Sequence, residues 1–522
     1  MIREISRRKC LRLWLCKPEY MGRTKWENRF VLLRFRKKNY MMFLKDLKRF
    51  KMERLYDKLK AYSESDFYAF HMPGHKRNKA LLGIELPYDL DITEIDGFDD
   101  LHHADGILKE EQERAARVFG AEESHFLVNG STAGILSAVM GCTHRGDKIL
   151  VARHCHKSIY HAIYMNGLVP RYVYPEFDIS MHMNGEISKE DVAKALAAEP
   201  DIKAVVIVSP NYDGVVSDVK GIAEVAHSYR IPLIVDEAHG PHFGFHPAFP
   251  GRANDLGADV VINSLHKTLP SLTQTAILHI NGKIVNRRRI KKYLDMLQSS
   301  SPSYIFMASL DACVDFVDGK CENAFELYVE RLQKFREELE PLQHLQILRT
   351  EHYDISKVVI STANANITSP ELADRLRKEY HLEMEMTGGT YVLAMTTVAD
   401  TQEGLNRLKA ALLEIDDQLE AKTAVSGSIE ISGELPRLEQ YFTPQEAADR
   451  EEDGEAEEIP WKESEGHISL EYAYLYPPGS PVIVPGERIS REAVELLCYY
   501  ETQNLQIEGI QTEGKIKVWK HE

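Results

Sequence analysis

Apolar residues in the middle of the chain gather in short runs, separated by stretches of helical period. The clearest runs are KILVA at 148–152, AVVIVS at 204–209, PLIVDEA at 232–238, DVVINS at 259–264 and TAILHI at 275–280. Runs of this length, rich in Val, Ile and Leu, are typical of strands that are buried on both faces. Their alternation with helical stretches from about 109 to 310 predicts an α/β domain with a mainly parallel sheet.

Three further stretches follow this domain. Residues 311–422 begin with a helical pattern and then alternate strands and helices, which predicts a second, smaller α/β domain. Residues 423–465 include the acidic run DREEDGEAEE, and this composition predicts a solvated linker without catalytic residues. Residues 466–522 combine the turn-rich sequence YPPGSPVIVPGE at 476–487 with a helical stretch and short β-like runs, so we expect a C-terminal α+β domain.

The N-terminal part of the chain divides at about residue 52. Residues 52–108 begin with a short helical stretch, followed by the loop HMPGHKR at 71–77, whose Pro and Gly predict a rigid surface arm. Residues 1–51 carry seventeen Lys or Arg against four Asp or Glu and show no clean period. This extension is either a basic amphipathic tail for a membrane surface or RNA, or sequence upstream of a native start at Met52.

The composition is that of a globular protein with two or three domains. The chain has 522 residues, of which 43% are hydrophobic and 28% charged, and its net charge is −16. Because the chain is acidic beyond residue 51, it is unsuited to a nucleic-acid substrate and better suited to a cationic small molecule. No apolar run has the length of a membrane span. The seven cysteines show neither C-x-x-C nor metal-type spacing, which favours a reducing cytoplasm.

Lys267 is the first candidate for chemistry. It lies in NSLHKTLPSLTQTAILHI at 263–280, between two apolar runs and close to Ser264 and His266. A lysine between buried strands needs its charge to be paired or used chemically, and burial lowers its pKa, as the amine of a Schiff-base lysine requires. A solvated loop lysine is the alternative.

Asp236 is the second candidate, because it ends the apolar run PLIVD. Open α/β sheets bind their ligands at the carboxyl ends of parallel strands, so the Asp236 carboxylate is placed to hold the protonated nitrogen of a cofactor's pyridine ring. A carboxylate that only caps the next helix is the alternative.

Two further sites precede Asp236 in the sequence. FLVNGSTAGILSA at 126–138 predicts a strand that turns through Gly130 into a helix beginning near Ser131 and Thr132. The N–H groups of a helix N-terminus and two hydroxyls suit a phosphate, although an ordinary N-cap would look the same. His156, in VARHCHKSIYH, is placed to lie over a flat ring, or it serves only the structure.

The order phosphate loop, histidine, strand-end aspartate and lysine resembles that of the fold-type-I pyridoxal-phosphate enzymes. Within them the chain resembles the Orn/Lys/Arg decarboxylase family, in its short form without an N-terminal wing domain. The resemblance runs from about Met52 to the C-terminus, which favours a native start at Met52. It rests on the motifs HMPGHKR, DEAHG (236–240), SLHKTLP (264–270), SPSY (301–304) and YPPGSPVIVPGE.

The resemblance implies a fold-type-I large domain at 109–310 that binds pyridoxal phosphate, a small domain at 311–422 and a C-terminal decarboxylase domain at 466–522. It also implies roles for particular residues. Lys267 would hold the cofactor covalently, His156 would stack on its ring, and Asp236 would pair with its ring nitrogen. The residues implied around the phosphate and the ring oxygen are Gly130, Ser131, Thr132, Ser264, His266 and His239, with Ser299 and Ser300 reaching the phosphate of a partner subunit.

The family's substrate channel is lined in part by its C-terminal region, so the resemblance makes Glu487 a candidate for the substrate's distal cation. His75 and Asp213 are second-rank substrate candidates, and a shared active site implies a homodimer or larger homo-oligomer. The loop at 91–108 is dense in Asp and His, but the resemblance gives it no metal.

The expected reaction is α-decarboxylation of a basic L-amino acid in the cytoplasm, with Lys267 or His266 returning a proton to Cα. Arginine, giving agmatine for polyamine synthesis, is favoured over lysine and ornithine. Two alternatives stay open: another fold-type-I enzyme such as an aminotransferase, and a non-catalytic regulator built on the same fold.

Overall fold

The structure is a computed structural model, which describes residues 54–178, 183–422, 434–475, 479–502, 505 and 507–520. The basic extension at 1–51, the first part of the expected linker at 423–433 and the YPP of the turn-rich sequence lie outside the described residues.

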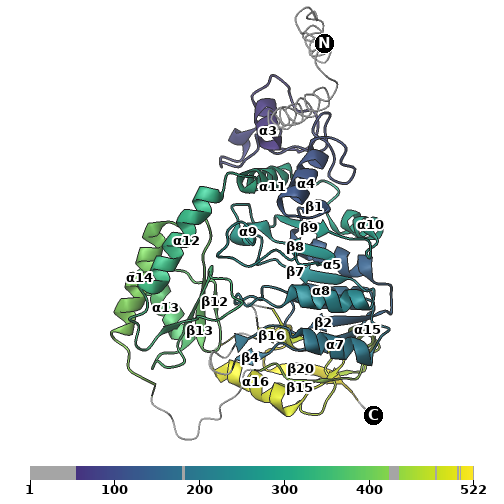
Figure 1. Ribbon diagram of the computed structural model, residues 1–522. Coiled ribbons are helices and arrows are strands. Elements are labelled where there is room, and N and C mark those ends of the chain that lie inside the picture. The colour runs from purple at the N-terminus through teal and green to yellow at the C-terminus, as the bar shows by residue number, and fades with distance from the viewer. Residues whose placement is uncertain are drawn as a thin grey trace, which may run out of the picture. The chain divides into compact units, whose positions relative to one another are not determined.

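A seven-stranded sheet forms the centre of the larger lobe (Figure 1). β2 pairs in parallel with β3 and β6, and the parallel pairing continues through β7 to β8. Of the seven strands, β9 alone runs against its neighbours β8 and β1. The predicted mainly parallel α/β sheet is therefore confirmed. Across the sheet the strands are β1 (Glu123–Leu127), β9 (Ala276–Ile280), β8 (Val260–Asn263), β7 (Leu233–Asp236), β6 (Val205–Val208), β2 (Lys148–Ala152) and β3 (Val169–Val173).

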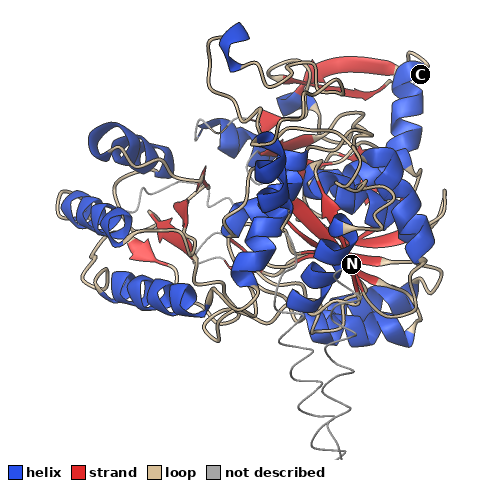
Figure 2. Cartoon of the chain, turned by 90° about the horizontal axis from the view of Figure 1, so that it is seen from above, coloured by secondary structure: helices blue, strands red, loops and turns tan. Residues whose placement is uncertain are grey.

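Helices line both sides of this sheet in the view from above (Figure 2). β6, β7 and β8 are buried along their whole length, because their Val, Ile and Leu side chains pack on both faces. α5 comes close to the sheet at Gly134, where a Cβ atom would lie 2.6 Å from the Leu127 side chain. The helices of this lobe are α4 (Ile107–Val118), α5 (Gly130–Cys142), α6 (Lys157–Met165), α7 (Lys189–Ala198), α8 (Val219–Ser228), α9 (Leu265–Thr268), α10 (Arg287–Leu297) and α11 (Tyr304–Val317).

A second, antiparallel sheet has the strand order β10 (Gln346–Ile347), β11 (Lys357–Ser361), β13 (Tyr391–Met395) and β12 (Met386–Thr387). Three helices lie along its outer side: α12 (Glu322–Glu337), α13 (Ser369–Tyr380) and α14 (Gln402–Asp416) (Figure 2). One apolar core joins residues of α11 and α12 with residues of β1 and β11. Because this core spans the expected boundary near residue 310, the division there stays a prediction.

The C-terminal part contains α15 (Pro444–Glu452), the short helix η2 (Trp461–Glu463), α16 (Arg491–Thr502) and seven short strands, in a core around Trp461 and Ile483. We expected 423–465 to be a solvated linker, and this was wrong for its described part. Residues 434–465 include α15, whose Ala447 is fully buried, and the acidic run forms the end of α15 and the start of β15. The strand pairs are β14 (Glu439–Gln440) with β18 (Glu487–Arg488), β15 (Ala456–Pro460) with β20 (Lys515–Trp519), and β16 (Ala473–Leu475) with both β17 (Pro481–Ile483) and β19 (Ile507–Glu508).

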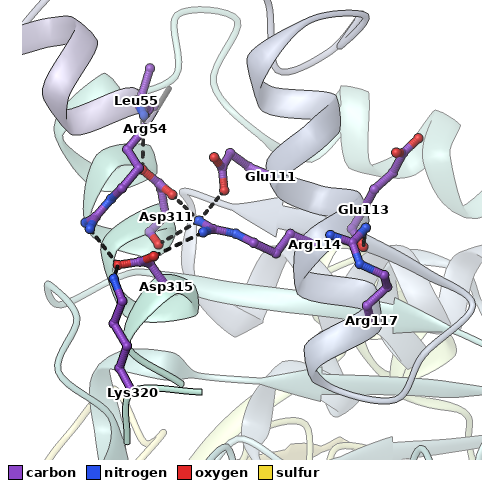
Figure 3. Close-up of polar contacts among 9 residues, drawn as sticks. All are labelled: Arg54, Leu55, Glu111, Glu113, Arg114, Arg117, Asp311, Asp315 and Lys320. Atoms are coloured by element: carbon purple, nitrogen blue, oxygen red, sulfur yellow. Dashed lines mark hydrogen bonds and ion pairs between the residues drawn. The ribbon is translucent and has the colours of Figure 1, made fainter. Parts of the chain in front are cut away.

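Hydrogen bonds and ion pairs, several of them buried, connect the first described residues to α4 and α11 of the large lobe (Figure 3). α3 (Leu55–Ser63) starts with the Leu55 N–H donating to the Asp311 carboxylate at 3.0 Å. Arg114 donates to both Glu111 and Asp311. Burial and the negative charge of Asp311 raise the pKa of Glu111, so that one proton is retained beside these two acids. The arm continues through the short helix η1 (Lys79–Leu81). β4 (Phe177–Asp178) pairs antiparallel with β5 (Met183–Asn184), whose Met183 shares a small core with Val359 and Leu393 of the antiparallel sheet.

Candidate active site

A cavity of about 570 Å³ opens at the carboxyl ends of the parallel strands. β7 ends at Asp236, β6 ends at Val208, and Lys267 follows β8 on the single turn α9. This edge is where open α/β sheets bind ligands. The lining residues are Gly130, Ser131, Thr132, His154, His156, Lys157, Val208, Tyr212, Asp236, Ala238, His239, His266, Lys267, Glu385, Met395 and Ser480. The structure therefore brings eight of the predicted site residues to one cavity.

Lys267 points its Nζ to within 2.8 Å of Nε2 of His239. Burial lowers the pKa of Lys267, and the charges of Asp236 and Glu385 oppose that effect only in part. A lysine with a lowered pKa exposes a neutral amine at a lower pH, and the neutral amine is the form that attacks an aldehyde.

Asp236 is almost fully buried, and its Oδ1 accepts a hydrogen bond from the Ala238 N–H at 3.2 Å. The pKa of this carboxyl is raised by burial, and the charge of Lys267 and the Ala238 N–H offset only part of that rise. A buried carboxylate with so few donors is suited to accept a proton-bearing ring nitrogen.

His156 is the N-cap of α6 as well as a wall of the cavity. Its Nδ1 accepts from the Ser158 N–H at 3.2 Å and lies 2.9 Å from the Ser158 hydroxyl. Burial and the nearby positive charge of Lys267 lower its pKa to about 4, so the imidazole is neutral at pH 7. The structural role that we considered for His156 is therefore present together with its place in the cavity.

The N-terminus of α5 supplies donors for a phosphate. Gly130 has φ +71°, a conformation that glycine adopts readily, and it turns the chain from β1 into the helix at Ser131 and Thr132. Ser264, just before α9, is not among the residues that line the cavity, but its buried hydroxyl has no hydrogen-bond partner among the described residues. An unsatisfied buried hydroxyl is costly, and a bound phosphate oxygen would satisfy it.

His266 completes this end of the cavity. Its Nδ1 lies 2.9 Å from the Thr275 carbonyl and must donate to it, because a carbonyl only accepts. Burial lowers the pKa of His266 and so favours the neutral imidazole, with a bare Nε2. A bound anion would favour protonation of that nitrogen. Together the donors at α5, the free Ser264 hydroxyl and the Asp236 carboxylate fit pyridoxal phosphate.

Glu487 does not line the cavity but pairs with Arg153, so its expected role for the substrate's distal cation was wrong for this structure. Its oxygens accept from Arg153 at 2.6 and 2.8 Å and from the Val484 N–H at 2.8 Å. Both charged side chains are fully buried. A carboxylate that already accepts from these donors stabilises the folded chain and is not available to bind a substrate cation. The C-terminal part instead reaches the cavity at Ser480, whose hydroxyl donates to the His154 carbonyl at 2.8 Å.

The two second-rank substrate candidates also lie outside the cavity wall. The His75 ring stacks on Tyr88 with a centroid distance of 4.1 Å, and its Nε2 lies 3.3 Å from Asp91. Asp213 is buried behind the wall and accepts from the Tyr391 hydroxyl at 2.6 Å, and burial raises its pKa to about 6. The structure thus gives both of them intramolecular partners.

Ser299 and Ser300 are exposed and outside the cavity of their own chain. The Ser299 N–H donates to the Asn129 side chain at 3.1 Å, so the loop lies beside the N-terminus of α5. Their expected contact with a partner subunit's phosphate stays a prediction.

Lys357, beside the cavity, and Glu385, on its wall, are two of the residues at the site that were missed in the sequence. Lys357, the first residue of β11, is fully buried, with Nζ 2.9 Å from Nδ1 of His239. Glu385 lines the cavity and accepts a hydrogen bond from Tyr212. A lysine at the start of an apolar run normally reads as a solvent-exposed strand end, so Lys357 carried no signal. Glu385 lies in EMEM, where the acids predict only a polar face.

Among the described residues, no helix has the length and apolar content needed to cross a membrane. In the same residues, no group of three or more His, Cys, Asp or Glu side chains is arranged to hold a metal ion. The loop at 91–108 instead uses Asp99 to accept backbone N–H groups of Gly106 and Leu108 at 2.8 and 2.9 Å.

Comparisons with known proteins agree with this geometry. The chain is 33% identical over 471 residues to the arginine decarboxylase of Bacillus subtilis, an alignment that covers 87% of this chain and 95% of that protein. It is 23% identical to the constitutive lysine decarboxylase of Escherichia coli, over 84% of this chain and 75% of that protein.

The solved structure of the Escherichia coli constitutive lysine decarboxylase superposes with a TM-score of 0.76 at 21% identity, covering 89% of this chain and 82% of that one, and so shares its fold. The expected fold-type-I architecture is confirmed. Models of the major and the C-terminal domain of Orn/Lys/Arg decarboxylases match residues 53–369 and 433–514. The chain therefore belongs to the Orn/Lys/Arg decarboxylase family.

Proposed function

We propose that this chain is a pyridoxal-phosphate-dependent decarboxylase whose substrate is L-arginine. The observation that carries the proposal is the single cavity that joins Lys267, Asp236 and His156 to the hydroxyls at the N-terminus of α5. Arginine is favoured because four relatives named arginine decarboxylase are 32–33% identical and are covered over 94–97% of their length. Those named lysine decarboxylase are 23–25% identical.

When bound, pyridoxal phosphate supplies an aldehyde for amines and an electron-withdrawing ring. Lys267 would hold it covalently, and Ser131, Thr132, Ser264 and His266 would hold its phosphate. Asp236 would keep the ring nitrogen protonated, so that the electrons left by CO₂ are accepted. His156 would cover the ring face and keep water from the carboxylate.

After CO₂ leaves, a proton must be delivered to Cα. The amine of Lys267 is a suitable donor, because burial lowers its pKa and makes its ammonium a stronger acid than that of a solvated lysine. His266 is the second candidate donor, from the phosphate end of the cavity. Glu385, on the cavity wall, offers a carboxylate for the substrate's distal cation.

An aminotransferase is the main competing function. Such an enzyme benefits from a fixed arginine that pairs with the substrate's α-carboxylate, whereas a decarboxylase must let that carboxylate go. No arginine is found among the described residues that line the cavity. This favours loss of CO₂ over transfer of the amino group.

Product analysis tests the proposal. L-arginine, L-lysine and L-ornithine are supplied separately, with and without added pyridoxal phosphate, and the amines formed are identified. We expect agmatine from arginine, dependent on the cofactor. Cadaverine or putrescine as the main product would overturn the substrate, and a keto acid without any amine would overturn the reaction.

We further propose a homodimer with active sites at the subunit interface. The arm exposes Phe67, Phe70, Met72 and Leu81, with Phe70 91% exposed, and such an apolar surface on one segment is typical of an interface. Mixing Lys267→Ala subunits with Ser299→Ala/Ser300→Ala subunits tests it: a shared site predicts activity well above that of either variant alone. Activity no higher than the average of the two would contradict it.

A cytoplasmic role in polyamine synthesis completes the proposal. The five cysteines of the described residues are all free, which suits a reducing compartment. We expect the concentration of agmatine-derived polyamines to fall in cells that lack this protein and to recover when the protein is restored.

A further inference from the structure

Three side chains form a hydrogen-bonded row that runs from the cavity wall to the antiparallel sheet. His239 lies in the middle, with Nε2 2.8 Å from Nζ of Lys267 and Nδ1 2.9 Å from Nζ of Lys357. Lys267 follows β8 of the seven-stranded sheet, and Lys357 begins β11 of the antiparallel sheet. Lys357 has no part in the mechanism described above, yet it is fully buried.

The number of protons in this row is limited by the imidazole. Burial is the main cause that lowers the pKa of His239 well below its ordinary value, so the ring is neutral and carries one N–H and one bare nitrogen. An ammonium donates hydrogen bonds and cannot accept one. The imidazole N–H needs an acceptor, so the lysine that faces it must be a neutral amine. The other lysine, as an ammonium or as an amine, donates to the bare nitrogen.

The surrounding charges decide which lysine keeps the proton. Lys357 is favoured as an ammonium by Asp354, Glu385 and Asp213, although burial lowers its pKa to about 8. Asp354 is a carboxylate, because its pKa lies below its ordinary value beside His242. Asp236 and Glu385 also favour the ammonium of Lys267, but Glu385 acts on both lysines and a cofactor's ring nitrogen would compete for Asp236.

Resting on the proposed function, we propose that Lys357 is a positioning residue for the reaction. Its ammonium donates to Nδ1 of His239, fixes the imidazole proton on Nε2, and directs that N–H at Nζ of Lys267, which is thereby held as a neutral amine. The row thus presents Lys267 in its nucleophilic form. Because Lys357 belongs to β11, the neutral form of Lys267 also depends on the position of the antiparallel sheet relative to His239.

Other charged groups around the row bear on its titration. They are the carboxyls of Asp213, Asp236, Asp354 and Glu385 and the imidazoles of His156 and His266. The Tyr212 ring lies between the two lysines, with its centroid 5.9 Å from each Nζ.

The test measures how apoprotein captures pyridoxal phosphate as a function of pH, followed by the change in the cofactor's absorbance. The midpoint of this profile reports the pKa of Lys267. In Lys357→Met, loss of the neighbouring charge and of the donor to Nδ1 should raise the midpoint by about one pH unit. Capture at a pH below both midpoints should then slow about tenfold.

Two further variants separate this role from packing. Lys357→Arg keeps a permanent cationic donor and should retain a midpoint close to that of the wild type. Tyr353→Phe removes a hydrogen bond to the Lys357 carbonyl (2.9 Å) and leaves the ammonium in place, so its midpoint should be unchanged. Circular dichroism confirms that each variant is folded.

A wild-type midpoint in folded Lys357→Met overturns the proposal, and so does an equal shift in all three variants. Agmatine formation by the wild-type protein is measured separately. Its absence would remove the proposed function, whereas an unshifted midpoint in protein that does form agmatine would remove only the role of Lys357.

Discussion

The variant Glu487→Gln tests whether this carboxylate stabilises the fold or binds the substrate. The amide can still accept a hydrogen bond from Arg153, but it leaves the guanidinium buried without a counter-charge. The N–H at Nε of Arg153 already lacks an acceptor among the described residues, so no other carboxylate compensates. Breaking a fully buried ion pair by removing one partner costs about 3–5 kcal/mol. We expect the free energy of unfolding of Glu487→Gln to fall by an amount in this range.

Urea unfolding followed by circular dichroism measures the loss. With a denaturant dependence of about 3 kcal/mol per M, the transition that includes the C-terminal part should move down by about 1–1.7 M. Glu495→Gln is the matched control, because Glu495 pairs with Arg491 on an exposed face and such pairs contribute about 0–1 kcal/mol. In the double variant Arg153→Met/Glu487→Met, no buried charge is left alone, so its loss should be smaller than that of Glu487→Gln.

A wild-type urea midpoint for Glu487→Gln would refute this reasoning. If that variant also showed a raised KM for arginine, the carboxylate would belong to substrate recognition after all. A loss of stability with an unchanged KM is the combination expected from the bidentate contact with Arg153.

Three further predictions concern the cofactor, the arm and the substrate. Ser264→Ala should weaken pyridoxal-phosphate binding by about 10- to 100-fold in a cofactor titration, the size of a hydrogen bond to a charged group, without loss of stability. Glu111 has a pKa raised from 4.5 to about 8 by burial and by Asp311, so folding takes up a proton and stability falls as the pH rises through that window. Glu111→Gln cannot lose the proton and should show a shallower fall in urea midpoint between these pH values; parallel curves would contradict this. Glu385→Gln should raise KM for arginine more than it lowers kcat, and an unchanged KM would exclude Glu385 from binding the distal cation.

The main features of the sheet and half of the site were readable because they depend on local pattern. Buried strands are visible in the sequence as apolar runs. Asp236 and Lys267 follow the carboxyl ends of such runs, which predicts that they lie at the same edge of the sheet. The glycine before Ser131 similarly marks the turn into a helix N-terminus. These signals need no knowledge of distant neighbours.

Residues whose role depends on distant partners could not be assigned in this way. Glu487 and Arg153 are 334 positions apart, and nothing local shows that they meet or that both are buried. Lys357 meets His239 across 118 positions.

The expected linker is a different kind of error. Its acidic composition hid a readable helix start, in which Thr443 and Glu446 form a capping box with Pro444 at the first position. A search for caps would have predicted α15 there.

The central claim is that Lys267 enables loss of the α-carboxylate from arginine. The most direct test is release of labelled CO₂ from L-arginine labelled in that carboxylate, with Lys267→Ala as the control. We predict labelled CO₂ and agmatine in equal amounts from the wild-type protein loaded with pyridoxal phosphate, and a rate at least about 10²-fold lower from Lys267→Ala. Retention of the label in a keto acid, or release of CO₂ by Lys267→Ala at the wild-type rate, would contradict the account.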